Sequence, residues 1–129
     1  MPKKKEIIRF GKFVMVGVLN TGISLAVIYV LMNIFHVNYK ISNLIGYVIG
    51  VINSFFWNKH WVFQAKKSGV KREIVLFLIA FGISYLVQYF CLIIMVECFH
   101  LNKNLSQLLA MGVYTITNYT LNKFITFKI

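Results

Sequence analysis

The sequence repeats itself at an offset of 64 residues, and this internal repeat constrains the possible folds more than any other feature. Phe-His-x-Asn occurs at 35–38 and again at 99–102, and Asn-Lys-x-x-x-Phe occurs at 58–63 and again at 122–127. Identical residues recur in register with no gap, among them the pairs Phe13/Phe77, Ser42/Ser106 and Leu44/Leu108. A repeat of this length indicates one structural unit that is used twice.

Each repeat contains two long apolar stretches. The chain is 59% hydrophobic and only 13% charged, and no charged residue occurs within 13–35, 41–58, 74–96 or 104–122. Crossing the hydrocarbon core of a bilayer takes roughly 20 apolar residues. The pattern therefore predicts four transmembrane helices, at about 9–35, 39–63, 72–99 and 103–127. A basic start followed by a full-length span, with no small-residue cleavage pattern, argues against a cleaved signal peptide.

The connections between the stretches predict how the helices are arranged. The linkers near 36–40 and 100–104 are so short that each pair of helices must form an antiparallel hairpin. Two spans in each repeat leave both hairpins in the same orientation. We therefore expect an all-α membrane protein with four transmembrane helices, built as two parallel-oriented helical-hairpin repeats. The single domain 1–129 would comprise repeat 1 at about 9–63, a basic loop at about 64–71 and repeat 2 at about 72–127, after a short mobile tail at 1–8.

The charges are distributed unevenly over this topology. The net charge is +11, and twelve of the fourteen basic residues fall before the first stretch, between the second and third, or after the fourth. Only Lys40 and Lys103 lie in the other two connections. Because cytoplasmic loops of membrane proteins are enriched in Lys and Arg, both termini and the middle loop are predicted to be cytoplasmic. This placement accounts for the positive charge without a nucleic-acid partner.

Residues for catalysis or metal binding are scarce. The acidic residues are Glu6, Glu73 and Glu97, and no two of them are spaced for general acid–base chemistry. Cys91 and Cys98 are seven residues apart on one predicted helix, about 10 Å of rise, which is too far for a disulfide. We expect no enzyme activity, cofactor or metal. A proton-coupled exporter is also disfavoured, because it needs a titratable group inside the membrane and the first stretch has none.

Small residues recur at every fourth position on two of the predicted helices. Gly46, Gly50 and Ser54 form one such stripe, and Gly17 and Thr21 form another. One interpretation is close helix packing, which small residues permit in lipid. The other is a gap that admits part of a lipid. Ala110 and Tyr114 replace the two glycines in the second repeat, so the halves differ there.

Polar residues also recur at matching depths within the apolar stretches. Polar side chains inside a membrane need a partner, water or a ligand. Hydrogen bonds between helices would account for many of them. The others are candidates for a polar path, and we assign to it Asn20, Thr21, Ser54, Ser84 and Gln88.

The two Asn-Lys pairs are the strongest candidates for a binding site. Asn58-Lys59 and Asn122-Lys123 end the second and fourth predicted helices, and Arg72 begins the third. Lysines at such positions complement the helix dipole and reach the lipid head groups, so an anchoring role would explain them. The alternative is a clamp in which ammonium groups, carboxamides and a guanidinium converge on a phosphate.

The same motifs resemble those of the GtrA-like family of small membrane proteins. Phe13-Val14-Met15-Val16-Gly17 with Thr21 is similar to the opening Phe-x-x-Val-Gly-x-x-x-Thr pattern of that family. The segment 54–63 resembles its Asn/Ser-Phe-x-x-Asn-Arg/Lys-x-Trp-x-Phe element, and Asn118-Tyr119 through Lys123 resembles its C-terminal counterpart. The chain departs from the family pattern at Ser54 and in having Lys59 where arginine is frequent.

The resemblance implies a function in cell-surface polysaccharide synthesis. Members of the family are thought to move polyprenyl-phosphate-linked sugars from the inner to the outer leaflet, between glycosyltransferases that charge and use the lipid. For this chain we expect a flippase in a bacterial cytoplasmic membrane, with the sugar lipid and membrane-associated glycosyltransferases as partners and a homo-oligomeric state. The alternative is a non-transporting adaptor that positions a glycosyltransferase. The phosphate-binding residues would be Asn58, Lys59, Arg72, Asn118, Asn122 and Lys123, with Asn118 also bordering the sugar path.

Overall fold

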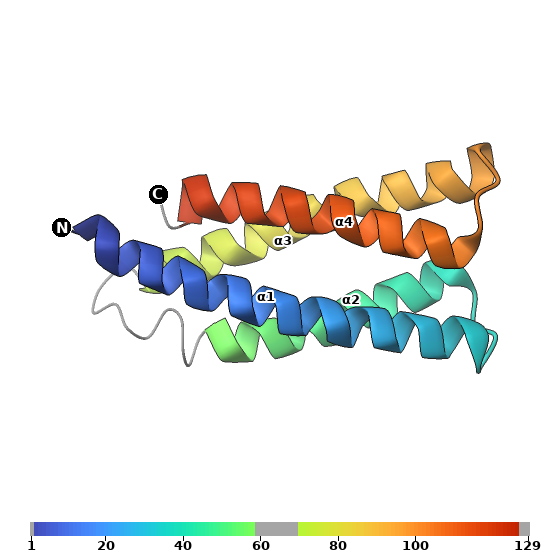
Figure 1. Ribbon diagram of the computed structural model, residues 1–129, viewed down its shortest axis with the longest axis horizontal. Helices are drawn as coiled ribbons and strands as arrows, with labels where there is room; N and C mark the ends of the chain where they lie inside the picture. Colours follow the sequence, from blue (N-terminus) through green and yellow to red (C-terminus); the bar gives the residue numbers. More distant parts are fainter. Residues whose placement is uncertain (1, 59–69, 127–129) are drawn as a thin grey trace.

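The computed structural model describes residues 2–58 and 70–126, and within these residues the protein is all-helical (Figure 1). The helices are α1 (Pro2–Asn33), α2 (Tyr39–Trp57), α3 (Val70–Ile93) and α4 (Lys103–Leu121). Two π-helical turns, η3 (Ile94–Cys98) and η4 (Asn122–Thr126), continue α3 and α4. The all-α fold with four helices is confirmed, and α2 and α4 begin at the predicted residues. The expected helical residues 59–63 and 127 lie outside the described part.

The four helices lie alongside one another, and neighbours in the chain are antiparallel (Figure 1). The starts of α1 and α3 and the ends of α2 and α4 lie together at what we call the terminal end. The α1–α2 and α3–α4 connections lie together at the opposite end, the turn end. Polar groups at the start of one helix can therefore meet those at the end of another.

The start of α1 differs from the expectation. A mobile tail was expected at 1–8, whereas α1 begins at Pro2. Proline is tolerated in the first turn of a helix, because its missing N–H would have no intrahelical partner there. No glycine or further proline interrupts the residues from Lys3 to Phe10, so the helix extends through the basic segment.

The repeated Phe-His-x-Asn motif forms the two turns. His36 and His100 both have a φ of 55°, the left-handed conformation that ends many helices. The residue after each histidine donates its backbone N–H to a carbonyl six positions back, at 2.8 and 2.9 Å. Asn38 and Asn102 then cap the next helix by accepting a backbone N–H two residues on, each at 2.8 Å. The motif recurs because the same helix-ending and helix-starting geometry is built twice.

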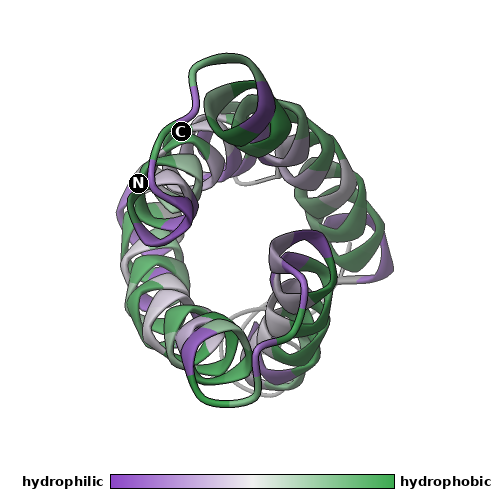
Figure 2. Cartoon of the chain, turned by 90° about the vertical axis from the view of Figure 1, so that its right-hand side faces the viewer, coloured by the Kyte–Doolittle hydropathy of each residue, from purple (hydrophilic) through white to green (hydrophobic). Residues whose placement is uncertain are grey.

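The interior is unusually polar and the surface unusually apolar. Buried residues include about as many polar or charged side chains as apolar ones, while large apolar side chains are exposed along every helix. Apolar residues colour most of the helical ribbon viewed from the turn end (Figure 2). This distribution suits a lipid environment rather than water. Within the described residues, Ile7–Asn33 and Lys71–Cys98 are long and apolar enough to cross a membrane.

Five contacts along the bundle join residues that are 64 positions apart. In order from the terminal end to the turn end, they are Arg9–Glu73, Phe13–Phe77, Tyr47–Met111, Asn43–Gln107 and Tyr39–Lys103. The first two join α1 to α3, and the other three join α2 to α4. We call this series the axial column. It shows that different helix pairs make the central contacts at the two ends of the bundle.

The glycine stripe of α2 packs against α1. A Cβ atom added at Gly46 would lie 2.4 Å from Ile28 Cγ1, and one at Gly50 would lie 2.1 Å from Ser24 Oγ. The close-packing interpretation is therefore confirmed for these two residues. Gly17 is different, since an added Cβ would meet no atom within 4 Å.

Hydrogen bonds between carboxamides join three helices near the turn end. Asn43 Nδ2 on α2 donates to Gln88 Oε1 at 3.1 Å and to Gln107 Oε1 at 3.0 Å, and Gln88 Nε2 donates back to Asn43 Oδ1 at 2.9 Å. Gln107 Nε2 donates to the Tyr39 carbonyl at 3.0 Å. The side chains of Asn43, Gln88 and Gln107 are at most 1% exposed, so water cannot reach them. Their hydrogen bonds to one another replace the missing bonds to water.

Candidate functional site

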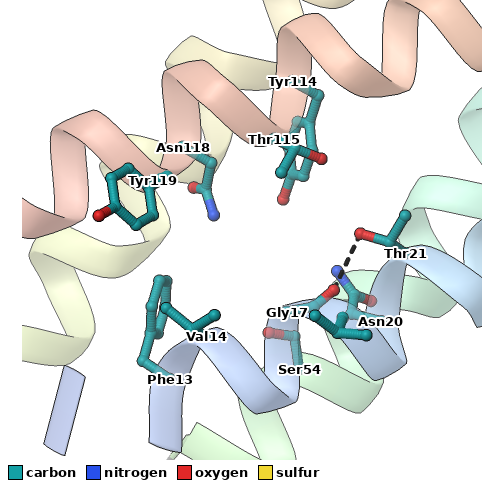
Figure 3. Close-up of a pocket in the computed structure, with 11 residues that line it drawn as sticks. Phe13, Val14, Gly17, Asn20, Thr21, Ser54, Tyr114, Thr115, Asn118 and Tyr119 are labelled. Carbon is teal, nitrogen blue, oxygen red and sulfur yellow. Dashed lines mark hydrogen bonds between the residues drawn. The ribbon is translucent and has the colours of Figure 1, made fainter. Parts of the chain in front are cut away.

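A cavity of about 240 Å³ lies beside the axial column, between α1, α2 and α4 (Figure 3). Residues from α1 form one wall, residues from α4 form the opposite wall, and Ser54 from α2 closes the side between them. Val18 and Tyr119 line the cavity although they are 69% and 43% exposed, so it opens to the outer surface of the bundle. The lining residues are Phe13, Val14, Gly17, Val18, Asn20, Thr21, Ser54, Tyr114, Thr115, Asn118 and Tyr119.

The α1 wall carries a buried polar group that lacks a partner. Asn20 is 7% exposed, and its Oδ1 accepts no hydrogen bond from the described residues. The neighbouring Thr21 is satisfied, because its Oγ1 donates to the Gly17 carbonyl at 2.9 Å. A buried polar atom without a hydrogen bond is costly, and especially so in lipid, where water cannot replace the missing partner. This oxygen lies against α2, since a Cβ added at Gly50 would come within 2.5 Å of it, so Asn20 belongs to the α1–α2 contact as well as to the cavity wall.

The α4 wall offers a donor to the same space. Asn118 Oδ1 accepts a hydrogen bond from Asn122 Nδ2 at 3.1 Å, and the amide nitrogen of Asn118 points into the cavity (Figure 3). Thr115 Oγ1 donates to the Met111 carbonyl at 2.8 Å. Polar groups thus face the cavity from α1 and α4, while the rings of Phe13 and Tyr119 border it toward the terminal end. The site can take a group that is hydroxylated on one side and apolar on another.

Two small residues of the α1 wall have aromatic counterparts 64 positions further along the chain. Phe81 corresponds to Gly17 and Tyr85 to Thr21. The Phe81 and Tyr85 rings stack at 6.0 Å, and the Tyr85 ring meets Tyr47 edge-on at 5.2 Å. Ser84, which corresponds to Asn20, is fully buried, and its Oγ has no partner. Large side chains therefore occupy, on the α3 side, the space that glycine and threonine leave open on the α1 side.

The structure brings three of the predicted path residues together and leaves two apart. Asn20, Thr21 and Ser54 line the cavity, together with Asn118. Ser84 belongs to the aromatic side, and Gln88 is bonded to Asn43 in the carboxamide network. Sequence reasoning missed Tyr114, Thr115 and Tyr119 as cavity residues. The difference between Gly17 and Phe81 at the repeat offset was the signal that could have located the cavity.

The predicted phosphate-binding residues lie at the terminal end, apart from Lys59, which is outside the described residues. Asn58 and Asn122 are fully buried. Asn58 Nδ2 donates to Ser54 Oγ at 3.0 Å, while its Oδ1 has no partner within 2–58 and 70–126. Lys123 is part-buried, with its Nζ 5.9 Å from the centre of the Tyr119 ring. Arg72 is exposed at the start of α3. A hydrogen-bonded path thus leads from Asn122 to Asn118 and the cavity.

A buried ion pair at the same end was not anticipated from the sequence. Arg9 is 1% exposed and Glu73 is fully buried, and Arg9 Nη1 donates to Glu73 Oε2 at 3.1 Å. From the sequence, Glu73 is considered only as a possible acid–base residue, and Arg9 only as one of the basic residues before the first apolar stretch. Their separation of 64 residues, with opposite signs, was the available signal.

A second cavity, of about 430 Å³, opens at the turn end. Its lining is rich in carboxamides and comes from the α1–α2 turn and the start of α4: Met32, Asn33, His36, Val37, Asn38, Tyr39, Asn102, Lys103 and Asn104. The carboxamides there bond to each other or to backbone. Asn33 Nδ2 donates to Asn104 Oδ1 at 3.0 Å, for example, and Asn38 caps α2.

Comparison with known proteins places the chain. The sequence profile of the GtrA/DPMS transmembrane domain matches residues 12–127. The chain belongs to this family. The GtrA/DPMS domain is transmembrane, so the protein is a membrane protein, in agreement with its apolar surface.

Three relatives illustrate the family. The Bacillus subtilis membrane protein YngA is 38% identical over 90 residues, which cover 67% of this chain but only 60% of YngA. The Listeria monocytogenes cell wall teichoic acid glycosylation protein GtcA is 25% identical over 127 residues, covering 96% of this chain and 88% of GtcA. A prophage bactoprenol-linked glucose translocase homolog of Escherichia coli is 36% identical over 62 residues, covering 48% of this chain and 52% of that protein. No solved structure matches the chain significantly.

Proposed function

We propose that this protein moves a polyprenyl-phosphate-linked sugar from the cytoplasmic to the outer leaflet of a bacterial cytoplasmic membrane, for glycosylation of a cell-surface polymer. The observation that carries the proposal is the cavity beside the axial column, with the polar side chains of Asn20 and Thr21 on one wall and Asn118 on the other. Relatives named for teichoic acid glycosylation and for bactoprenol-linked glucose translocation support the substrate class.

The proposed topology has four spans in two parallel hairpin repeats, with both termini and the basic loop at about 64–71 in the cytoplasm. The axial column supports this topology. If a two-fold axis relates the two repeats, a residue can touch its counterpart 64 positions away only where both lie close to that axis, and five such contacts run along the bundle. The distribution of the basic residues supports the orientation, since twelve of fourteen precede the first apolar stretch, separate the second from the third or follow the fourth. In this orientation, the terminal end faces the cytoplasm.

The off-axis position of the cavity suits a substrate with a head and a long tail. Moving a sugar through hydrocarbon alone would leave its hydroxyl groups without hydrogen bonds. Asn20, Thr21, Ser54 and Asn118 would replace water around the sugar. Because the cavity reaches the outer surface past Val18 and Tyr119, the prenyl chain would stay in the lipid.

The phosphate would be held at the terminal end. Asn58, Asn122, Lys123, Arg72 and Lys59 are the proposed contacts, with Asn118 leading from them into the cavity. Hydrogen bonds to a charged oxygen are stronger than those between neutral groups, so buried carboxamides beside lysines suit a phosphate. The absence of a partner for Asn58 Oδ1 among the residues that the structure describes supports this assignment.

The protein would act as a translocator without catalytic chemistry of its own. Net movement would then follow from consumption of the sugar lipid on the outer side by a membrane-associated glycosyltransferase. Four helices enclose little volume around a sugar, so we expect a second copy or a glycosyltransferase to complete the path. Exposed apolar residues along every helix offer surface for such contacts.

A translocation assay with purified protein in liposomes tests the proposal. Polyprenyl-phosphate glucose would be placed in one leaflet, and its arrival in the other followed by an enzyme that cannot cross the membrane. We expect flipping by the wild type and strong loss in Lys59→Ala/Lys123→Ala. The matched control is Lys40→Ala/Lys103→Ala, which removes the same charge from the turn end. No flipping by a folded wild type would contradict the proposal and favour the adaptor that positions a glycosyltransferase.

A further inference from the structure

The Arg9–Glu73 pair is a two-pronged contact sealed inside the terminal end. Arg9 Nη1 donates to Glu73 Oε2 at 3.1 Å, and Arg9 Nη2 donates to Glu73 Oε1. The Arg9 side chain is 2% exposed and the Glu73 side chain is 0% exposed. Arg9 lies near the start of α1 and Glu73 in the first turn of α3. The pair therefore ties these two helices together at that end.

Stability alone does not explain an ion pair at this position. Removing two charges from water costs about as much as their attraction returns, so an apolar pair often serves equally well. The next pair in the axial column is apolar, with the Phe13 and Phe77 rings joining the same two helices at 6.1 Å. One helical turn away, two aromatic rings make the α1–α3 contact. The charged pair at Arg9 and Glu73 is therefore not required merely to hold these two helices together.

The surroundings connect Arg9 to the cavity. Arg9 precedes Phe13 by one helical turn, about 6 Å of rise, and Phe13 lines the cavity. The adjacent Phe10 ring contacts the ring of Tyr119, another cavity residue, at 5.2 Å. The fully buried Asn58 and Asn122 follow α2 and α4 at the terminal end. A buried guanidinium thus lies at the same end of the bundle as the proposed phosphate-binding carboxamides, one turn from the cavity residue Phe13.

We propose that Arg9 is a phosphate-binding residue and that Glu73 is its resting counter-ion. The fork of donors that matches a carboxylate also matches the oxygens of a phosphate ester. An entering lipid phosphate displaces Glu73 from Arg9 and thereby releases the tie between α1 and α3. Loading with an anionic head group then opens the terminal end, whereas an uncharged lipid leaves it closed. This inference rests on the proposed function and adds a binding residue and a gate to it.

The two partners of the pair have opposite effects in a binding assay. The probe is polyprenyl phosphate, with the matching polyprenol as the uncharged control, titrated into the full-length protein in detergent. Arg9→Gln removes the binding fork and is expected to weaken binding about tenfold or more. Glu73→Gln removes the competing anion, keeps a side chain of the same shape, and is expected to tighten binding about threefold or more. Neither variant changes the response to polyprenol.

A distance measurement tests the gate without altering the pair. Spin labels at the exposed Lys5 and Lys71, with Cys91 and Cys98 replaced by serine, report the separation of α1 and α3 at the terminal end. Polyprenyl phosphate is expected to lengthen this distance, and polyprenol to leave it unchanged. An unchanged distance in the presence of saturating polyprenyl phosphate would overturn the gate.

The outcomes separate this inference from the proposed function. If the wild type binds polyprenyl phosphate and both single variants lose binding equally, the pair is structural and the translocation proposal stands. The double variant Arg9→Glu/Glu73→Arg keeps an ion pair but moves the guanidinium from α1 to α3. If this variant has both the thermal stability and the polyprenyl phosphate affinity of the wild type, binding does not require an arginine at position 9, and the inference fails. If the folded wild type binds no polyprenyl phosphate, the proposed function and this inference fall together.

Discussion

The two sides of the bundle repeat the same sequence pattern, but the described residues that line the open cavity come from α1 and not from α3. On the α1 side, Gly17 and Thr21 leave room and Asn20 brings a carboxamide to the cavity wall. On the α3 side, Phe81 and Tyr85 stand at the corresponding positions, and Tyr85 stacks further on Tyr89 at 5.8 Å. The comparison teaches that side-chain size at two positions decides whether a repeat has an open site. Small residues on α1 leave the cavity open, and large ones at the corresponding positions of α3 fill the space. One side would then serve the substrate while the other holds the bundle rigid.

The largest effect should come from copying the closed side onto the open one. Gly17→Phe with Thr21→Tyr places the α3 residues in α1, where an added Cβ at Gly17 meets no atom. We expect translocation in liposomes to fall about tenfold or more, a loss of at least ~1.4 kcal/mol of substrate stabilisation. Thermal stability should be unchanged or higher. Gly17→Ala is the control, and wild-type flux through the double variant would show that the cavity is not the path.

An intermediate effect should come from opening the closed side. Phe81→Ala removes a ring that packs against Tyr85 and Tyr114. The expected loss in free energy of unfolding is about 1 kcal/mol, below that for a soluble core, because in lipid only packing is lost. Thr21→Ala should change the free energy of unfolding by roughly a few tenths of a kcal/mol at most. Unfolding in mixed detergent measures both, and equal losses would contradict the assignment of the two sides to rigidity and binding.

The smallest effect should come from making the polar residues equal. Asn20→Ser copies Ser84 onto the open side and removes the carboxamide from the cavity wall. We expect about a threefold loss of translocation, in keeping with one hydrogen bond between neutral groups. Ser84→Asn is the reciprocal variant, and it should leave transport unchanged because the cavity does not include that position. A loss in Ser84→Asn that matched Asn20→Ser would place the path on both sides.

Much of the fold was predictable because it depends on local signals. The starts of α2 and α4 follow from Asn38 and Asn102, which cap the helices after a histidine that ends the previous one. The length of the apolar stretches predicted the helices. The beginning of α1 was misjudged because a charged segment looks like a tail, although it contains nothing that breaks a helix.

The site was only partly predictable, since it depends on which helices touch. Asn20, Thr21 and Ser54 were singled out as polar residues in apolar stretches, and they do share a cavity. Gln88 has the same signature in the sequence, yet it bonds to Asn43. Polarity alone does not distinguish a residue that lines a ligand cavity from one that is hydrogen-bonded to a neighbouring helix. Comparing the repeats for size, rather than for identity, separates the two cases.

The axial column has a consequence for how such a chain could have arisen. A two-fold axis between identical hairpins would set each residue of the column against its own copy, so Arg9 would face a second arginine in a dry interior. The present pairs are Arg9 with Glu73, Asn43 with Gln107 and Tyr47 with Met111, and of the column only Phe13 with Phe77 keeps a like pair. The halves have therefore diverged in four of the five pairs at which they meet. Ancestry is still legible in the turns, but the two hairpins have become unlike partners that can no longer be exchanged for one another.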